Sequence, residues 1–347
     1  MAIIQNLIVN QYGVHVSKHG ERLLVMRIGE GTPSERRVQQ APLLHLESVL
    51  IEGRGISLSA DAIQACCERG IPIHFVSRRG RPYAAVYSAG LTGTVQTRRA
   101  QMAAYLDKRG VALARAFAEG KIHNQAALLK YLARNRKESD PDLAQELSWC
   151  AGEVRAHLAE LEQLDAECID EIREQLLSVE GRAAKRYWHA LKHVIPAEFE
   201  WPGRERRGAT DRVNSALNYG YGILYSQIER AAVLAGLDPY GGFTHVDRPG
   251  KPSLVLDLIE EFRVPAVDRV VVGLVNKRTR LEQDGKGLLI QETRRMLAER
   301  VLARLEKPER YEGKRHALRA IMQRQARHLA TFVREQRAAY KPFLVSW

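Results

Sequence analysis

The sequence has few cysteines and no long hydrophobic run, and these scarcities narrow the class of protein. The four cysteines are Cys66, Cys67, Cys150 and Cys168, and no two of them form a CxxC motif. A structural zinc site is therefore not indicated, and a reduced, cytoplasmic setting suits the chain best. No stretch of about 18 consecutive apolar residues occurs, so we predict no membrane span. The first residues also lack the basic and apolar segments of a signal peptide.

Several common catalytic motifs are also missing. Gly250-Lys251 is followed by Pro252, so the phosphate-binding motif GxxxxGK[ST] is not formed, and neither HExxH nor GxSxG occurs. Three tyrosines share one predicted helix, at Tyr219, Tyr221 and Tyr225. Glycines and apolar residues surround them, which favours packing in the core over a role as nucleophile.

Acidic side chains are outnumbered. The chain has 53 Lys and Arg against 41 Asp and Glu, a formal net charge of +12. Residues 294–341 contribute much of the excess, with 14 basic and 5 acidic side chains. Over the whole chain, such a field attracts polyanions and predicts a nucleic-acid partner. For the basic segment alone, a solvent-exposed helical face rich in arginine is the alternative interpretation.

The period of the apolar residues changes near residue 90, which predicts an α+β fold. We expect a small β-rich N-terminal domain over residues 1–88, a linker over 89–94 and a large all-α C-terminal domain over 95–347. The predicted strands are 7–9, 14–16, 23–28, 49–51, 73–76 and 84–87, with one helix between Ser59 and Gly70. The predicted helices of the second domain are 100–121, 124–136, 142–163, 166–180, 182–194, 212–235, 270–275, 288–305 and 314–337.

Three places hold acidic or imidazole side chains next to apolar residues. Glu180 stands where one predicted helix gives way to the next, and His245 closes a glycine-rich turn. Asp257 and Glu260 lie three residues apart, on one face of a helix. The residues around this pair are Leu254, Val255, Leu256, Leu258, Ile259 and Phe262. A carboxylate on such an apolar element is costly unless an arginine or a metal ion neutralises it.

Each place has an ordinary interpretation when it is taken alone. Glu180 suits a charge at a helix end that pairs with Arg182 or Lys185. His245 suits a hydrogen-bonded structural histidine. Glu260 suits an ion pair with Arg263, three residues further along the helix.

Taken together, the three places suggest a metal site. One imidazole and two carboxylates suit a divalent ion such as Mn²⁺ or Mg²⁺. On a basic protein, such an ion points to phosphodiester chemistry. The cations expected to hold DNA phosphates are Lys251, Arg248, Arg263 and Arg182. The hypothesis assumes that Glu180 and His245, 65 residues apart, meet in the fold.

Four separated motifs resemble one known family. They are Glu180-Gly181-Arg182-Ala183-Ala184-x-x-Tyr187, Asn214-x-x-x-Asn218-Tyr219-Gly220-Tyr221, Gly236-Leu237-Asp238-Pro239-x-x-Gly242-Phe243-x-His245 and Leu254-Val255-Leu256-Asp257-Leu258-x-Glu260-x-Phe262-Arg263. In this order, after a β-rich domain and a linker, they resemble the CRISPR-associated adaptation endonuclease, the spacer-acquisition integrase. The resemblance covers nearly the whole chain.

The resemblance implies a metal-dependent DNA endonuclease and integrase. Such a protein inserts short foreign DNA into a CRISPR array by transesterification with a 3′-hydroxyl. The resemblance further implies that Glu180, His245 and Glu260 are the catalytic residues and bind one ion, Mg²⁺ or Mn²⁺. Asp257 would support these ligands from behind or bind the ion as a further ligand, and Lys251 would contact a DNA phosphate.

The resemblance also implies an assembly. Family members form homodimers through their β-domains, and two dimers hold a small ferredoxin-like CRISPR adaptation protein. The resulting heterohexamer binds double-stranded DNA, both the spacer precursor and the CRISPR repeat. Two alternatives stay open: a standalone metal-dependent nuclease acting on branched DNA, and a non-catalytic DNA-binding scaffold of the same fold whose carboxylates pair with Arg248 and Arg263.

Overall fold

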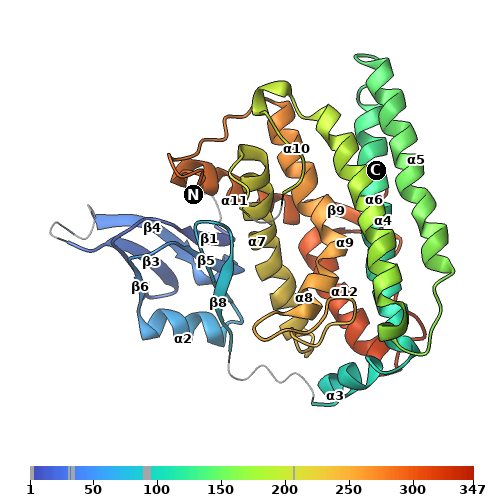
Figure 1. Cartoon of the computed structure of the whole chain (residues 1–347). Helices are drawn as coiled ribbons and strands as arrows, with labels where there is room; N and C mark the ends of the chain where they lie inside the picture. Colours follow the sequence, from blue (N-terminus) through green and yellow to red (C-terminus); the bar gives the residue numbers. More distant parts are fainter. Residues whose placement is uncertain (1–3, 30–31, 33–35, 89–94, 206–207) are drawn as a thin grey trace.

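A strand-rich N-terminal part lies beside a larger helical part (Figure 1). The structure is a computed structural model that describes residues 4–29, 32, 36–88, 95–205 and 208–347. The linker predicted at 89–94 lies outside these residues. No helix in the described ranges is long and apolar enough to cross a membrane.

The N-terminal part contains two four-stranded sheets. The first has the order β1 (Asn6–Val9), β5 (Ser48–Glu52), β7 (Ile73–Val76) and β8 (Pro82–Val86), and the second has the order β4 (Arg37–Pro42), β3 (Arg22–Arg27), β2 (Val14–His19) and β6 (Ile56–Leu58). The pairs β1–β5, β5–β7 and β2–β6 are parallel, and the other pairs are antiparallel. A 3-10 turn, η1 (Leu43–His45), follows β4. Alternate residues such as Val14 and Val16 are buried, as expected for strands with one face on a core.

The short helix α2 (Ala60–Glu68) is the one predicted between Ser59 and Gly70. The Ser59 hydroxyl accepts a hydrogen bond from the Ala62 amide at 3.2 Å, which satisfies one free donor of the first turn. Gly70, directly after the C-cap, has a φ of 65°, which glycine adopts without the steric cost of a side chain.

Long helices make up the second part. They and its shorter elements are α3 (Val95–Ala104), α4 (Lys108–Arg134), α5 (Pro141–Glu162), α6 (Ile169–Val194), η2 (Ala197–Phe199), α7 (Arg212–Leu234), α8 (Ser253–Leu258), α9 (Glu260–Arg263), η3 (Val264–Asp268), α10 (Arg269–Asn276), α11 (Gln291–Leu305) and α12 (Leu318–Val333). Helices α4, α5 and α6 pack side by side, and α7 packs against α11 and α12 (Figure 1). The η3 segment is π-helical and contains Pro265, which has no amide hydrogen to donate to a regular helical bond.

The two parts are joined through the first sheet. Val49 and Ile51 of β5 belong to the hydrophobic core of the N-terminal part, whereas Leu50 between them belongs to the core of the helical part. The two faces of the sheet therefore pack against different cores. Buried polar groups also cross this contact: Glu52 accepts a hydrogen bond from the Tyr219 hydroxyl at 2.8 Å and another from Arg294.

The turn between β7 and β8 approaches α7 very closely. A Cβ atom placed on Gly222 would lie 1.5 Å from the Gly80 carbonyl oxygen, so only glycine fits at this position of α7. Gly80 itself has a φ of 74° and lies against the Tyr219 backbone. Tyr219 is 1% and Tyr221 8% exposed, which agrees with the core-packing interpretation of these tyrosines.

The predicted fold class, a strand-rich region followed by a large helical part, is confirmed. Several element boundaries were wrong. Glu180 lies inside one continuous helix, α6, and not at a junction of two helices. The helix predicted over 314–337 begins only at Leu318, because a hairpin of β9 (Pro308–Tyr311) and β10 (Lys314–Ala317) precedes it. Strands β4 and β6 were not predicted.

Candidate metal centre

Two buried glutamates from different helices face one lysine. Glu180 lies on α6, Glu260 begins α9, and Lys121 lies on α4 between them. The Lys121 ammonium donates a hydrogen bond to Glu180 Oε1 and lies 3.0 Å from Glu260 Oε2. The exposed fractions are 5% for Lys121, 9% for Glu180 and 4% for Glu260. Three helices thus bring two anions and one cation together away from solvent.

Arg263 supplies a second cation. Its Nε atom lies 3.1 Å from Glu260 Oε1, and its guanidinium lies over the Tyr221 ring, 4.8 Å from the ring centre. Burial opposes ionisation of Glu260, but Arg263, Lys121 and His245 outweigh it and lower the pKa of Glu260 to about 2. Burial also opposes the charge of Lys121, but Glu180 and Glu260 raise its pKa. In both groups the nearby opposite charges outweigh burial, so the charged forms are favoured.

One oxygen of Glu260 has an incomplete hydrogen-bond shell. Glu260 Oε2 is buried and forms its ion pair with Lys121 without a well-aligned hydrogen bond. Buried carboxylate oxygens normally accept such bonds, so this atom has unused capacity to bind a cation.

Asp257 holds the histidine of the glycine-rich turn. Its carboxylate accepts hydrogen bonds from the amides of Phe243, Thr244 and His245 at 2.6, 3.0 and 3.0 Å. The His245 Nδ1 atom lies 2.7 Å from Asp257 Oδ1. In the neutral ring, Nδ1 therefore carries the hydrogen of this bond, and Nε2 keeps a free lone pair. A carboxylate behind a histidine is the usual arrangement for a metal-binding imidazole.

Close packing and two side chains fix the turn before His245. A Cβ atom on Gly242 would lie 2.5 Å from the Ser253 Cβ atom, so this turn approaches α8 only with glycine there. Gln101 on α3 accepts a hydrogen bond from the Asp238 amide and donates one to the Gly241 carbonyl. Arg173 on α6 donates to the carbonyl oxygens of Phe243 and Thr244.

The structure brings some of the predicted residues together and not others. Glu180 and Glu260 share Lys121, and His245 is close enough to affect the charge of Glu260. Within the described residues, however, no group of three or more His, Cys, Asp or Glu side chains is placed to hold a metal ion. The three-ligand set therefore stays a prediction. The donor chemistry fits a divalent ion, because two carboxylates already surround a cation and an oriented imidazole lies near them.

The predicted phosphate-binding residues lie in different settings. Arg248 is exposed and pairs through its backbone with Lys251, whose pKa is lowered by partial burial and by Arg248. Arg263 is instead engaged with Glu260. Arg182 bonds to Ser178 and Glu160, not to Glu180.

Sequence reasoning missed Lys121, Gln101 and a basic cleft. The cleft has a volume of about 420 Å³ and lies between the β7–β8 turn and α7. Its cationic lining residues are Arg78, Arg79, Arg81, Arg263 and Lys286. Arg263 also lines a small recess together with Lys121 and Glu260, so the cleft adjoins Glu260. The run Arg78-Arg79-Gly80-Arg81 was a visible signal, but we interpreted it only as a turn.

The fold of the chain matches those of two solved structures. It matches a solved casposase bound to an integration product with a TM-score of 0.79 and 24% identity, over 97% of this chain and 93% of that one. It also matches a chain of a solved Cas6-RT-Cas1–Cas2 complex with a TM-score of 0.71 and 22% identity, over 99% of this chain and 37% of that one. These likenesses establish the two-part fold.

Sequence comparison then gives the family. The family model described as CRISPR associated protein Cas1 matches residues 7–303. The CRISPR-associated endonuclease Cas1 1 of Archaeoglobus fulgidus is 38% identical over 98% of this chain and 99% of its own length. The chain belongs to the CRISPR-associated Cas1 family.

Proposed function

We propose that the chain is a divalent-metal-dependent DNA endonuclease and integrase that inserts short foreign DNA into a CRISPR array. The observation that carries this proposal is the pair of buried glutamates, Glu180 and Glu260, which share Lys121 beside an oriented histidine. Family membership and the endonuclease name of the Archaeoglobus relative support the activity. The basic cleft next to the glutamates supports a DNA substrate.

Glu180, Glu260 and the Nε2 atom of His245 would hold the ion, Mg²⁺ or Mn²⁺. When bound, such an ion would stabilise negative charge on the phosphate that reacts. Asp257 keeps His245 in the tautomer that leaves Nε2 free. Lys251 and Arg248, on the turn after His245, would bind phosphate oxygens and position the DNA. Arg182, one turn from Ser178 on α6, is proposed for the same role.

The proposed reaction is a direct transesterification. The oxygen of the incoming 3′-hydroxyl forms a bond to phosphorus, and its proton is lost to the solvent. The bond from phosphorus to the 3′-oxygen of the repeat breaks, and that oxygen takes up a proton. No covalent bond to the protein is needed.

We further propose that the chain works in the cytoplasm as a homodimer, and that two dimers with a small ferredoxin-like partner bind double-stranded DNA as a heterohexamer. Large apolar side chains are exposed on the N-terminal part: Tyr12 is 81%, Ile28 65% and Leu44 85% exposed. Such side chains suit a surface that is covered in an assembly. The solved Cas6-RT-Cas1–Cas2 complex supports a protein partner.

A strand-transfer assay with a short duplex and a supercoiled repeat plasmid tests the proposal. We expect Glu180→Gln, Glu260→Gln and His245→Ala to lose at least about 100-fold of the transfer rate, while each variant still folds and its DNA affinity stays close to that of the wild type. EDTA should abolish transfer. Glu153→Gln, on the outer helix α5, is the matched control and should keep full activity.

The same assay separates the alternatives. Cleavage of branched DNA without joining, and without any need for a protein partner, would indicate a standalone nuclease. DNA binding with no EDTA-sensitive reaction would indicate a non-catalytic scaffold. Full transfer by any of the three variants would remove that residue from the proposed site.

A further inference from the structure

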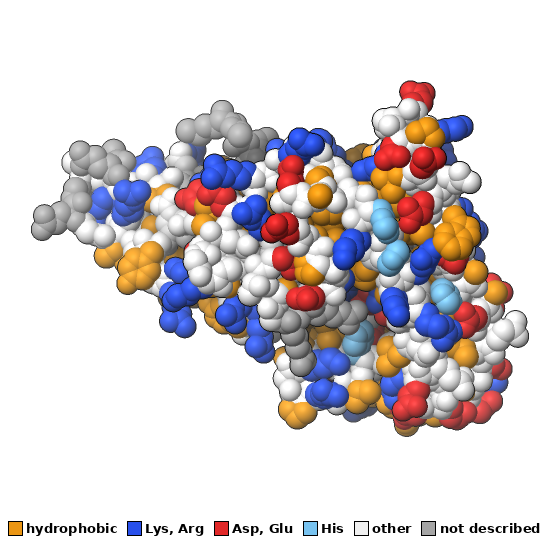
Figure 2. All heavy atoms as spheres, turned by 45° about the horizontal axis from the view of Figure 1, so that its top comes forward, with side chains coloured by type: hydrophobic (Ala, Val, Ile, Leu, Met, Phe, Trp, Pro, Cys, Tyr) orange, Lys and Arg blue, Asp and Glu red, His pale blue; other side chains and the backbone are white. Residues whose placement is uncertain are grey.

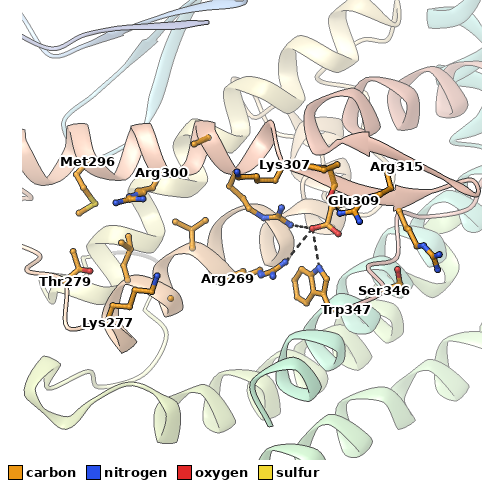
Figure 3. Close-up of a pocket in the computed structure, with 17 residues that line it drawn as sticks. Arg269, Lys277, Thr279, Met296, Arg300, Lys307, Glu309, Arg315, Ser346 and Trp347 are labelled. Atoms are coloured by element: carbon orange, nitrogen blue, oxygen red, sulfur yellow. Dashed lines mark hydrogen bonds and ion pairs between the residues drawn. The ribbon is translucent and has the colours of Figure 1, made fainter. Parts of the chain in front are cut away.

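A second basic pocket lies away from the glutamates (Figure 3). It has a volume of about 980 Å³ and lies between α10, α11, the β9–β10 hairpin and the final residues of the chain. None of Glu180, His245 and Glu260 lines it. Along the chain, the pocket residue Arg269 follows Glu260 by nine residues, through α9, η3 and the start of α10.

The cations of this pocket are of two kinds. Arg269 and Arg304 are fixed, because both pair with Glu309, the one acidic residue among those that line the pocket. Arg269 is also held between the Trp347 and Tyr131 rings, 4.3 and 4.7 Å from their centres. The charge of Glu309 is thus already shared by two arginines.

Five other cations have no acidic partner within the described part of the chain. They are Lys277, Arg300, Lys307, Arg310 and Arg315, and all are exposed and line the pocket. Figure 3 shows Lys277 and Arg300 at one end of the pocket and Lys307 near its middle. Uncompensated like charges around one hollow repel one another, and an anion that binds there relieves this repulsion.

The floor of the pocket is apolar. Val270 and Leu274 from α10 and Met296 from α11 line it. A ligand that suits the pocket therefore combines several negative charges with flat apolar groups. Single-stranded nucleic acid has this combination, because its phosphates form a charged chain and its bases have apolar faces.

We propose that this pocket binds a single-stranded segment of nucleic acid, with its phosphates on the unpaired cations and its bases on the apolar floor. The volume is in the upper range of pockets that enclose small ligands, so a short stretch of one strand fits where a duplex does not. The choice of nucleic acid as ligand rests on the proposed function. The site adds a second contact for a strand, separate from the proposed reaction centre.

Binding of a fluorescent single-stranded deoxythymidine oligomer to the full chain tests this proposal. The titration is made in EDTA, so that the proposed metal centre takes no part. For Arg300→Ala/Lys307→Ala we expect about a tenfold weaker affinity at low salt. We also expect the slope of log affinity against log salt to become less negative by about 1.4, because two phosphate contacts are lost.

The control variant removes two cations elsewhere. Arg155→Ala/Lys137→Ala loses the same charge from exposed positions that do not line the pocket, and it should keep the slope of the wild type. All four positions are exposed, so melting temperatures should not change. An equal loss of affinity and slope in both double variants would overturn the proposal, because it would indicate a diffuse charge effect.

Competition identifies the source of the phosphate. If deoxythymidine monophosphate or inorganic phosphate displaces the strand at equal phosphate concentration, the pocket binds small phosphate compounds and the strand assignment is wrong. Failure of this proposal can be told apart from failure of the proposed function. If the pocket does not bind the strand, EDTA-sensitive strand transfer is still observed. If the chain is not an integrase, the EDTA-independent binding of the strand is still observed.

Discussion

Lys121 balances the charge of two carboxylates inside the helical part. Without it, Glu260 would still pair with Arg263, but the buried carboxylate of Glu180 would lose the cation with which it pairs. A buried ion pair whose one partner is removed leaves an uncompensated charge, which costs much more than the pair itself contributes. Lys121 therefore has a structural role that its position on the longest helix does not reveal.

We expect Lys121→Met to destabilise the fold by about 3 kcal/mol, because two buried carboxylates lose their shared cation. Divalent ions should compensate: Mn²⁺ should raise the melting temperature of the variant more than that of the wild type. Urea unfolding and thermal melting with and without Mn²⁺ measure both effects. Lys130→Met, an exposed lysine on the same helix, should change stability by less than about 0.5 kcal/mol.

Charged residues on apolar elements were the sequence signal that selected Glu180, Asp257 and Glu260. The same criterion applied to Lys121, next to Ile122, would have selected it as well. Its partners were not predictable, because they depend on how α4 packs against α6 and α9, which no local pattern encodes. The ordinary pairing of Glu260 with Arg263 is present, whereas the pairing of Glu180 with Arg182 is not.

Helix α6 shows why a glycine alone does not end a helix. Gly181 costs roughly 1 kcal/mol relative to alanine, but α6 continues through it. Side chains on both sides of Gly181 are buried, among them Leu176, Val179, Ala183 and Tyr187. Their burial stabilises the helix by more than the one glycine costs. At β9 and β10 the error was to predict helix where the chain forms a hairpin. The residues of these strands, many of them charged, show no alternating apolar pattern. The turn residues Glu312 and Gly313, with φ of 48° and 77°, were the sole local indication of a hairpin.

Contact between elements makes Gly222 irreplaceable. We expect Gly222→Ala to destabilise the protein by at least about 2 kcal/mol, because its Cβ atom would overlap the Gly80 carbonyl and push the β7–β8 turn away from α7. Chemical denaturation measures the change.

The matched control is Gly152→Ala on α5, where a Cβ atom meets nothing within 4 Å. There alanine should stabilise by up to about 1 kcal/mol through its higher helix propensity. Equal effects at the two glycines would contradict the close approach of the turn and α7.

At the scale of the whole molecule, part of the positive charge is internal. Arg294, Arg304 and Arg319 belong to the basic segment 294–341, yet they pair with Glu52, Glu309 and Glu306. The surface therefore carries less of this charge than the sequence suggests, and on the face in Figure 2 basic side chains are spread over both parts of the chain. Net charge suggested a nucleic-acid partner, but only the fold divides these arginines into internal and exposed ones.

His74 makes the stability of the whole molecule depend on pH. It is 1% exposed and neither ring nitrogen has a hydrogen-bond partner. Burial, with smaller effects of Arg230 and Arg319, lowers its pKa to about 3. The unfolded chain therefore binds a proton near pH 6.5 that the folded chain does not bind until about pH 3, so stability falls as the pH falls through this window.

Between pH 7 and pH 5 this one histidine should cost about 2 kcal/mol of stability. His74→Phe should remove that part of the pH dependence, and the difference between the two proteins in urea unfolding at pH 7 and pH 5 measures it. Parallel losses in the wild type and the variant would show that His74 is not the responsible group.

The lysine between the glutamates has a consequence for how the protein matures. Many metal centres depend on their ion in order to fold, since bare acids repel each other inside a protein. Here the ammonium group of Lys121 already neutralises acids from two helices, so their burial needs no ion. An ion held by Glu180 and Glu260, as we propose, would have to displace this ammonium group, and loading would then be an exchange of one cation for another.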